Sequence, residues 1–172
     1  MKFRKLGQSD LNMSVITLGT WGMGGDFWGK VDDEQSIATI QAALDAGITT
    51  IDTAPAYGRG HSEELIGKAI KGRRREDIIL ATKVGIDIHH NKEHICTPET
   101  IAQEIEESLQ RLGTDYIDLY QVHWPDLHTP MEETFMALNK VRESGKARYI
   151  GVSNFSPEQM DEAAKYCPIV SA

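Results

Sequence analysis

The chain has 172 residues and a formal net charge of −8, with 40% hydrophobic and 26% charged residues. This composition is typical of a globular protein, and we expect one domain over residues 1–172. The acidic balance argues against nucleic-acid and anionic-membrane partners. No apolar run approaches the roughly 18 residues of a membrane span, and residues 1–7 lack an apolar signal region. We therefore expect a cytoplasmic protein whose cysteines, Cys96 and Cys167, are reduced.

Strand-like apolar runs alternate with amphipathic helix patterns along the whole chain. Residues 6–11 indicate a turn between two short N-terminal strands. Further strands are expected at residues 15–19, 48–53, 77–84, 116–124 and 149–155, with a sixth beginning at 168–171. Helices are expected at residues 32–47, 62–71, 97–112, 129–145 and from 156 onward.

Local signals mark several of these helix ends. Asp32 is a helix-capping residue with Gln35 three positions on, the spacing of a capping box. Pro98 fits the first helical position of the third helix. Gly47 fits the C-terminal end of the first helix, where glycine adopts the left-handed conformation without strain.

Alternating strands and helices predict a parallel sheet with right-handed crossovers. A doubly wound sheet would show a G-x-G-x-x-G turn, but the run from Gly22 to Gly25 is followed by Phe27, so the motif fails. We therefore expect the first five βα units of a (β/α)8 barrel, ending as strand six begins, since a complete barrel needs roughly 250 residues. The side chains around Ile51, Leu80 and Val122 are expected to face the barrel interior and to lose their opposite wall.

Chemically useful side chains stand at the ends of these strands. Asp52 ends the second strand and Tyr57 follows it in a loop; Lys83 and His123 end the third and fourth strands, and residues 153–154 end the fifth. In a parallel barrel all these ends lie on one face, where barrel active sites are built. Each residue alone has an ordinary structural explanation, but together they favour a catalytic site.

The four residues fit one reaction. A neighbouring Lys83 ammonium favours the ionised phenol and so makes the Tyr57 hydroxyl a better proton donor. Asp52 would hold Lys83 charged and in place, and His123 could donate a hydrogen bond to a carbonyl oxygen. This is a proton donor and oxyanion site for a carbonyl that receives hydride, which a cofactor must supply.

Four runs carry a family resemblance. Residues 45–58, 79–84, 116–124 and 145–155 occur in the order of the aldo-keto reductase motifs. The chain therefore resembles the N-terminal part of an aldo-keto reductase, and its opening looks most like the bacterial general-stress branch. The resemblance implies NADP(H)-dependent reduction of an aldehyde or ketone, with Tyr57 as general acid supported by Asp52, Lys83 and His123.

The resemblance also implies binding residues. Ser153 and Asn154 would bind the nicotinamide carboxamide, and Asp52 would also bind the cofactor. The run Gly19, Thr20 and Trp21 matches the family's first loop, which lies against nicotinamide and substrate. The expected walls of the substrate pocket are Trp21, Trp28, Tyr57, His123 and Trp124.

Several alternatives stay open. The loop from His89 to Cys96 offers nitrogen and sulfur ligands, but its spacing matches no standard zinc site, and no metal is expected. The basic run at residues 71–75 fits a solvated helix end better than a phosphate site. A non-catalytic regulatory or binding module, like the channel subunits that share this fold, is the alternative function. Besides a small carbonyl substrate, the expected partner is a second copy of the chain, joined through the open sheet.

Overall fold

The fold is described by a computed structural model that covers residues 1–25, 29–89 and 94–172. Five strands form one parallel sheet in the order β3-β4-β5-β6-β7, with bounds Thr17–Gly19, Thr50–Asp52, Ile79–Val84, Ile117–Val122 and Ala147–Val152. A separate antiparallel hairpin pairs β1 (Phe3–Lys5) with β2 (Asn12–Ser14). The predicted start of a sixth strand is present as a parallel bridge between Ile169 and Ile150 of β7. The architecture matches the expected first five βα units of a (β/α)8 barrel.

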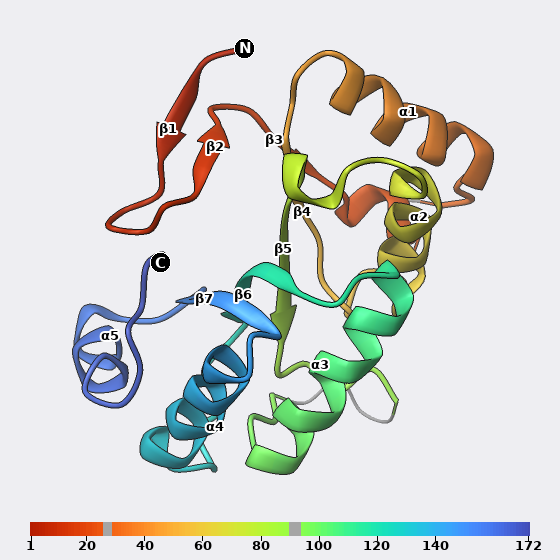
Figure 1. Cartoon of the computed structure of the whole chain (residues 1–172). Helices are drawn as coiled ribbons and strands as arrows, with labels where there is room; N and C mark the ends of the chain where they lie inside the picture. Colours follow the sequence, from red (N-terminus) through yellow and green to blue (C-terminus); the bar gives the residue numbers. More distant parts are fainter. Residues whose placement is uncertain (26–28, 90–93) are drawn as a thin grey trace.

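Helices connect the strands, and the first four lie around the side of the sheet away from the hairpin (Figure 1). Their bounds are Asp33–Asp45 (α1), His61–Ile70 (α2), Pro98–Leu112 (α3), Met131–Glu143 (α4) and Pro157–Ala163 (α5). Two short 3-10 helices, η1 (Trp21–Gly24) and η2 (Arg75–Asp77), precede α1 and β5. Within the described residues, no helix is both long enough and apolar enough to span a bilayer.

The predicted helix ends are largely confirmed. Asp32 accepts a hydrogen bond from the Gln35 amide, Thr97 caps α3 with Pro98 in its first turn, and Gly47 is left-handed with φ +86°. The fourth helix differs, because Pro130 is its N-cap, whereas the Thr129 hydroxyl donates to Asp126. The third strand begins at Ile79 rather than residue 77, since η2 extends to Asp77 and Ile78 is its C-cap.

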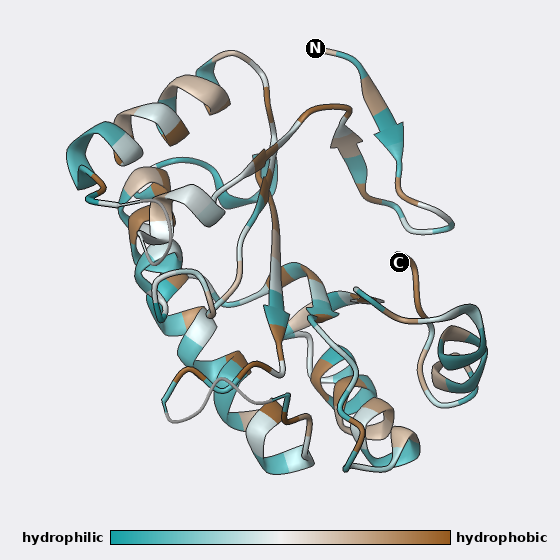
Figure 2. Cartoon of the chain, turned by 180° about the vertical axis from the view of Figure 1, so that it is seen from behind, coloured by the Kyte–Doolittle hydropathy of each residue, from teal (hydrophilic) through white to brown (hydrophobic). Residues whose placement is uncertain are grey.

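The main core lies between the sheet and the helices. Hydrophobic residues line the strands and the helix faces turned toward them, while the outer helix faces are hydrophilic (Figure 2). Ile51, Leu80 and Val122 are fully buried in this core, together with residues of α1 to α4. The prediction that they face the barrel interior is therefore wrong. Because side chains alternate along a strand, the neighbouring positions of β4 and β5, including Asp52 and Lys83, face the other way.

A smaller cluster lies on the hairpin side of the sheet. Leu11 of the hairpin turn packs with Ala81 of β5 and Leu119 of β6. The turn is also joined to β7, because the Asp10 amide donates to the Tyr149 hydroxyl over 3.1 Å. The hairpin thus covers part of the inner face of the sheet and leaves the carboxyl ends of the strands open for a site.

Candidate active site at the carboxyl ends of the strands

Asp52, Tyr57 and Lys83 lie together, as predicted. The Lys83 ammonium is 3.0 Å from both Asp52 carboxylate oxygens and donates to the Tyr57 hydroxyl over 3.2 Å. It also donates to the Thr53 carbonyl at 2.8 Å. The Lys83 side chain is 8% exposed and that of Asp52 33% exposed, so the pair is held in place by the fold while its carboxylate still reaches solvent. One buried cation therefore links a carboxylate to a phenol.

His123 stands beside this group at the end of β6. Its amide donates to the Val84 carbonyl over 3.0 Å, and its ring lies edge-on to Tyr57 with centroids 6.0 Å apart. Burial, with smaller contributions from Lys83 and His94, lowers the pKa of His123 from 6.5 to about 4. The imidazole is therefore neutral at pH 7, where it can donate a hydrogen bond without carrying charge.

Ser153 and Asn154 follow β7 and lie next to His123. Asn154 has φ +62°, a left-handed conformation that asparagine tolerates better than most residues. Its side-chain amide donates to the His123 carbonyl over 2.8 Å and to the Ser153 hydroxyl over 3.0 Å. These bonds use the amide nitrogen and a Ser153 lone pair, which leaves the Asn154 Oδ1 acceptor and the Ser153 hydroxyl proton for a bound group.

The first loop divides into exposed and buried parts. Gly19 is exposed, and a Cβ there would meet no atom within 4 Å. Thr20, in contrast, is fully buried: its hydroxyl donates to the Asp52 carbonyl and accepts from Ser62 at 2.7 Å. Its side chain thus joins β3, β4 and α2, and the loop surface left for a ligand comes from Gly19 and Trp21.

Two of the predicted tryptophan walls are exposed. Trp21 is half exposed and lies 6.3 Å from the Tyr57 ring, centroid to centroid. Trp124 is also exposed and stacks on His94 with parallel rings 5.5 Å apart. The remaining predicted wall, Trp28, lies outside the described residues. The loops after β3, β5 and β6 therefore bring aromatic surface to the same face as the tetrad of Asp52, Tyr57, Lys83 and His123.

The glycine run after β3 has a packing role. A Cβ on Gly24 would lie 2.5 Å from the backbone carbon of Tyr57, and one on Gly58 would collide with Gly24 in return. Glycine is required at both positions because the first loop and the Tyr57 loop touch backbone to backbone. The run fixes the position of Tyr57 and is not a phosphate-binding turn.

Comparison with known proteins gives a consistent result. The family model described as "Aldo/keto reductase family" matches residues 15–172. The chain belongs to the aldo/keto reductase family. It is 51% identical to aldo-keto reductase YhdN of Bacillus subtilis, over 98% of this chain and 52% of the relative. It is 39% identical to the NADH-specific methylglyoxal reductase of Escherichia coli, over 96% and 56%. A glycerol dehydrogenase structure from Gluconobacter oxydans aligns with TM-score 0.87 and 43% identity, over 98% and 53%.

The chain thus spans about half the length of the curated relatives it matches. Within that half, the motifs that carry the family resemblance contain the side chains that the fold brings together. Residues 52, 57, 83 and 123 of the matched region meet at one end of the sheet, whereas the basic run after α2 lies elsewhere. There, Arg73 pairs with Asp45 at 2.8 Å, and Arg75 pairs with Asp118 at 2.7 Å.

A buried polar network lies behind the tetrad. The sequence patterns did not predict it. Glu63 of α2 is fully buried, accepts from the Thr82 hydroxyl at 2.6 Å and pairs with Arg111 of α3 at 2.6 Å. Glu104 of α3 accepts from the Gly85 amide at 3.1 Å, and burial raises its pKa to about 8. Thr82 and Gly85 flank Lys83 by one and two residues, so both carboxyls support the strand end that carries it.

The histidine-containing loop does not form a described metal site. His89 pairs with Glu107 at 3.2 Å, while His94 stacks on Trp124. Cys96 is buried, and burial raises the pKa of its thiol to about 12. No group of three or more candidate ligands occurs among the described residues, which exclude positions 26–28 and 90–93. The described part of the loop packs toward the active-site face through His94.

Proposed function

We propose that this site reduces an aldehyde or ketone to an alcohol with a nicotinamide cofactor, preferably NADPH. The observation that carries the proposal is the Lys83 ammonium, which contacts both the Asp52 carboxylate and the Tyr57 hydroxyl. A phenol held next to a buried cation can release its proton to a developing alkoxide. The half-exposed aromatic surface around it suits a small carbonyl substrate.

Each residue of the tetrad has a distinct task in this proposal. The Tyr57 hydroxyl donates its proton to the carbonyl oxygen as the carbonyl carbon accepts a hydride, and the resulting phenolate then takes up a proton from solvent. Lys83 stabilises the transient phenolate, and Asp52 keeps Lys83 charged and oriented. His123, neutral at pH 7, donates a hydrogen bond to the same carbonyl oxygen and polarises it.

The residues present fit a nicotinamide. Its carboxamide has one acceptor and one donor group, which complement the Ser153 hydroxyl proton and the Asn154 Oδ1 acceptor. Gly19 leaves open space at the end of β3, next to Asp52. When bound there, the cofactor would supply the hydride, which no side chain can provide. Because one relative is named NADH-specific, NADH is tested beside NADPH.

The alternative of a non-catalytic module receives less support. Such a module has no need for a buried lysine that joins a carboxylate and a tyrosine hydroxyl, since a lysine buried for stability alone is costly. The enzyme would act in the cytoplasm, in agreement with two buried cysteines that form no disulfide.

The proposal is tested by following absorbance at 340 nm during reduction of a panel of small aldehydes. The assay uses the 172-residue chain and a chimera in which the C-terminal half of the Bacillus subtilis relative follows Ala172. We expect cofactor oxidation by the chimera that depends on the aldehyde. Ser153→Ala should weaken cofactor affinity about fivefold, the worth of one hydrogen bond. A well-folded chimera that oxidises neither NADPH nor NADH with any aldehyde would contradict the proposal.

A further inference from the structure

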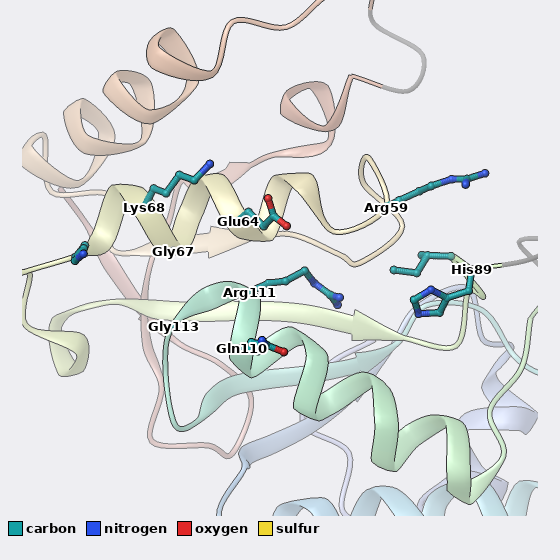
Figure 3. A pocket seen from close by; sticks show the side chains of 10 residues that line it. Arg59, Glu64, Gly67, Lys68, His89, Gln110, Arg111 and Gly113 are labelled. Atoms are coloured by element: carbon teal, nitrogen blue, oxygen red, sulfur yellow. The ribbon is translucent and has the colours of Figure 1, made fainter.

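A hollow lies outside the active site, between α2 and α3. Its volume is about 740 Å³, within the range of small-molecule sites. Figure 3 shows Arg111 between the two helices, with Arg59 and His89 at one end and Lys68 on α2. None of its lining residues belongs to the tetrad. The lining residues are Arg59, Glu64, Gly67, Lys68, Lys71, Ile88, His89, Gln110, Arg111 and Gly113.

Arg111 is held rigidly at the base of this hollow. Its guanidinium donates from Nε to buried Glu63 at 2.6 Å, and from its other nitrogens to Glu107 at 3.3 Å and Ser108 at 3.4 Å. The side chain is only 15% exposed. A guanidinium has five N–H donors, so two remain after these three bonds. These two free N–H donors are on a guanidinium whose orientation the three hydrogen bonds fix.

Glycines make room for this arginine. A Cβ on Gly60 would lie 2.6 Å from Arg111 Cδ, and a Cβ on Gly67 would lie 2.5 Å from the Arg111 carbonyl oxygen. A side chain at either position would displace Arg111 or separate α2 from α3. A Cβ on Gly113, in contrast, would meet nothing within 4 Å. The hollow therefore has its depth because small residues line both helices.

Three exposed cations line the hollow beside Arg111. Arg59 is exposed and left-handed, with φ +54°, in the loop before α2. Lys68 and Lys71 are exposed on α2 and at its end. None of the three forms an ion pair with any residue in the described parts of the chain. Glu64 is the one carboxylate among the lining residues, so cations dominate this surface on a chain whose net charge is −8.

We propose that this hollow, the α2–α3 pocket, binds a small phosphorylated molecule. A rigid guanidinium with two unused donors suits the planar, bidentate contact that phosphate oxygens favour. Arg59, Lys68 and Lys71 can close over a second phosphate or the remaining oxygens of the first. Glu64 opposes a dianion but lies within one helical turn of Lys68, which can compensate it.

The proposal is tested with inorganic pyrophosphate and the 172-residue chain in isothermal titration calorimetry at low salt. We expect a dissociation constant on the order of 1 mM or tighter. The double substitution Arg59→Asn and Lys68→Gln should weaken it at least about tenfold, since a charge-assisted hydrogen bond contributes more than a neutral one. Asparagine is chosen at position 59 because it tolerates the left-handed conformation.

The matched control is the double substitution Arg4→Gln and Lys140→Gln. It removes the same charge from exposed positions on β1 and α4, away from the pocket. We expect pyrophosphate affinity to stay within twofold of the parent, with amide NMR shifts on pyrophosphate addition confined to residues of the pocket such as Gly67 and Gly113. Equal losses in the two double variants would mean non-specific charge attraction. That result, or no detectable binding by the folded parent chain, overturns the proposal.

Discussion

Two aspartates pair with cations at opposite ends of the same sheet. At the amino end, Asp118 of β6 is 2% exposed and accepts from Arg75 at 2.7 Å and Arg148 at 2.9 Å. At the carboxyl end, Asp52 of β4 is 33% exposed, and among side chains of the described residues only Lys83 donates to it. Lys83 in turn contacts the hydroxyl of Tyr57.

The two aspartates differ in role: Asp118 stabilises the fold, whereas Asp52 belongs to the candidate active site. The carboxylate of Asp118 also accepts from the Leu80 amide at 3.0 Å, so protein donors surround it and it joins β5, β6 and β7. The hairpin is attached to the same network, because Arg148 also pairs with Asp10 at 2.7 Å. Asp52 has acceptor capacity and solvent access left, and its cation is shared with an ionisable phenol. This matches the general division of a barrel into a stabilising amino end and a reactive carboxyl end.

The largest effect on stability is expected at the amino end. Asp118→Asn leaves two arginines without their buried carboxylate, which should cost about 3 kcal/mol of unfolding free energy. Asp10→Asn, at an exposed position of the same network, should cost about 0–1 kcal/mol. Urea unfolding followed by circular dichroism measures both. A loss for Asp10→Asn as large as that for Asp118→Asn would show that burial does not distinguish the two aspartates.

A smaller, pH-dependent effect is expected at the carboxyl end. The folded-state pKa of His123 is about 4, below its ordinary value of 6.5. The folded protein thus binds fewer protons than the unfolded chain between these values, and stability falls as the pH drops from about 6.5 to 4. His123→Asn should remove on the order of 1–2 kcal/mol of that fall, allowing for the partial exposure of the ring.

The measurement is the unfolding free energy of parent and variant at intervals from pH 7 to pH 4. His128→Asn, which alters an exposed histidine of the following loop, is the control and should leave the curve unchanged. Parallel curves for the parent and His123→Asn would show that the imidazole is not held neutral by its surroundings.

The weakest effect is expected at the edge of the sheet. Strand β3 has one neighbour, β4, in the described sheet, and Val15 and Ile16 beside it are about half exposed. Exposed strand edges and apolar side chains favour pairing with another chain, so we propose a homodimer through this open sheet. Sedimentation velocity should detect self-association that Ile16→Lys reduces. A parent chain that stays monomeric at all concentrations would exclude the dimer.

Much of this arrangement could be predicted from local patterns. Alternating strands and helices gave the order of elements, and parallel strand ends brought Asp52, Lys83 and His123 to one face. The direction of Ile51 was misjudged because a strand buried on both faces shows no clear alternation. The Arg75–Asp118 and Glu63–Arg111 pairs were missed, since their partners are 43 and 48 residues apart and charged residues carry no periodic signal of their burial.

The central claim, that the tetrad at the carboxyl end performs carbonyl reduction with Tyr57 as its acid, is tested most directly by Tyr57→Phe in the chimera. Phenylalanine keeps the ring and removes only the hydroxyl that Lys83 contacts. We predict that turnover falls roughly 10²–10⁴-fold, while NADPH affinity, measured by fluorescence titration, stays within about twofold. Tyr116→Phe, at the amino end beside Arg75, should leave both unchanged. Turnover of Tyr57→Phe within a few-fold of the parent would contradict the account.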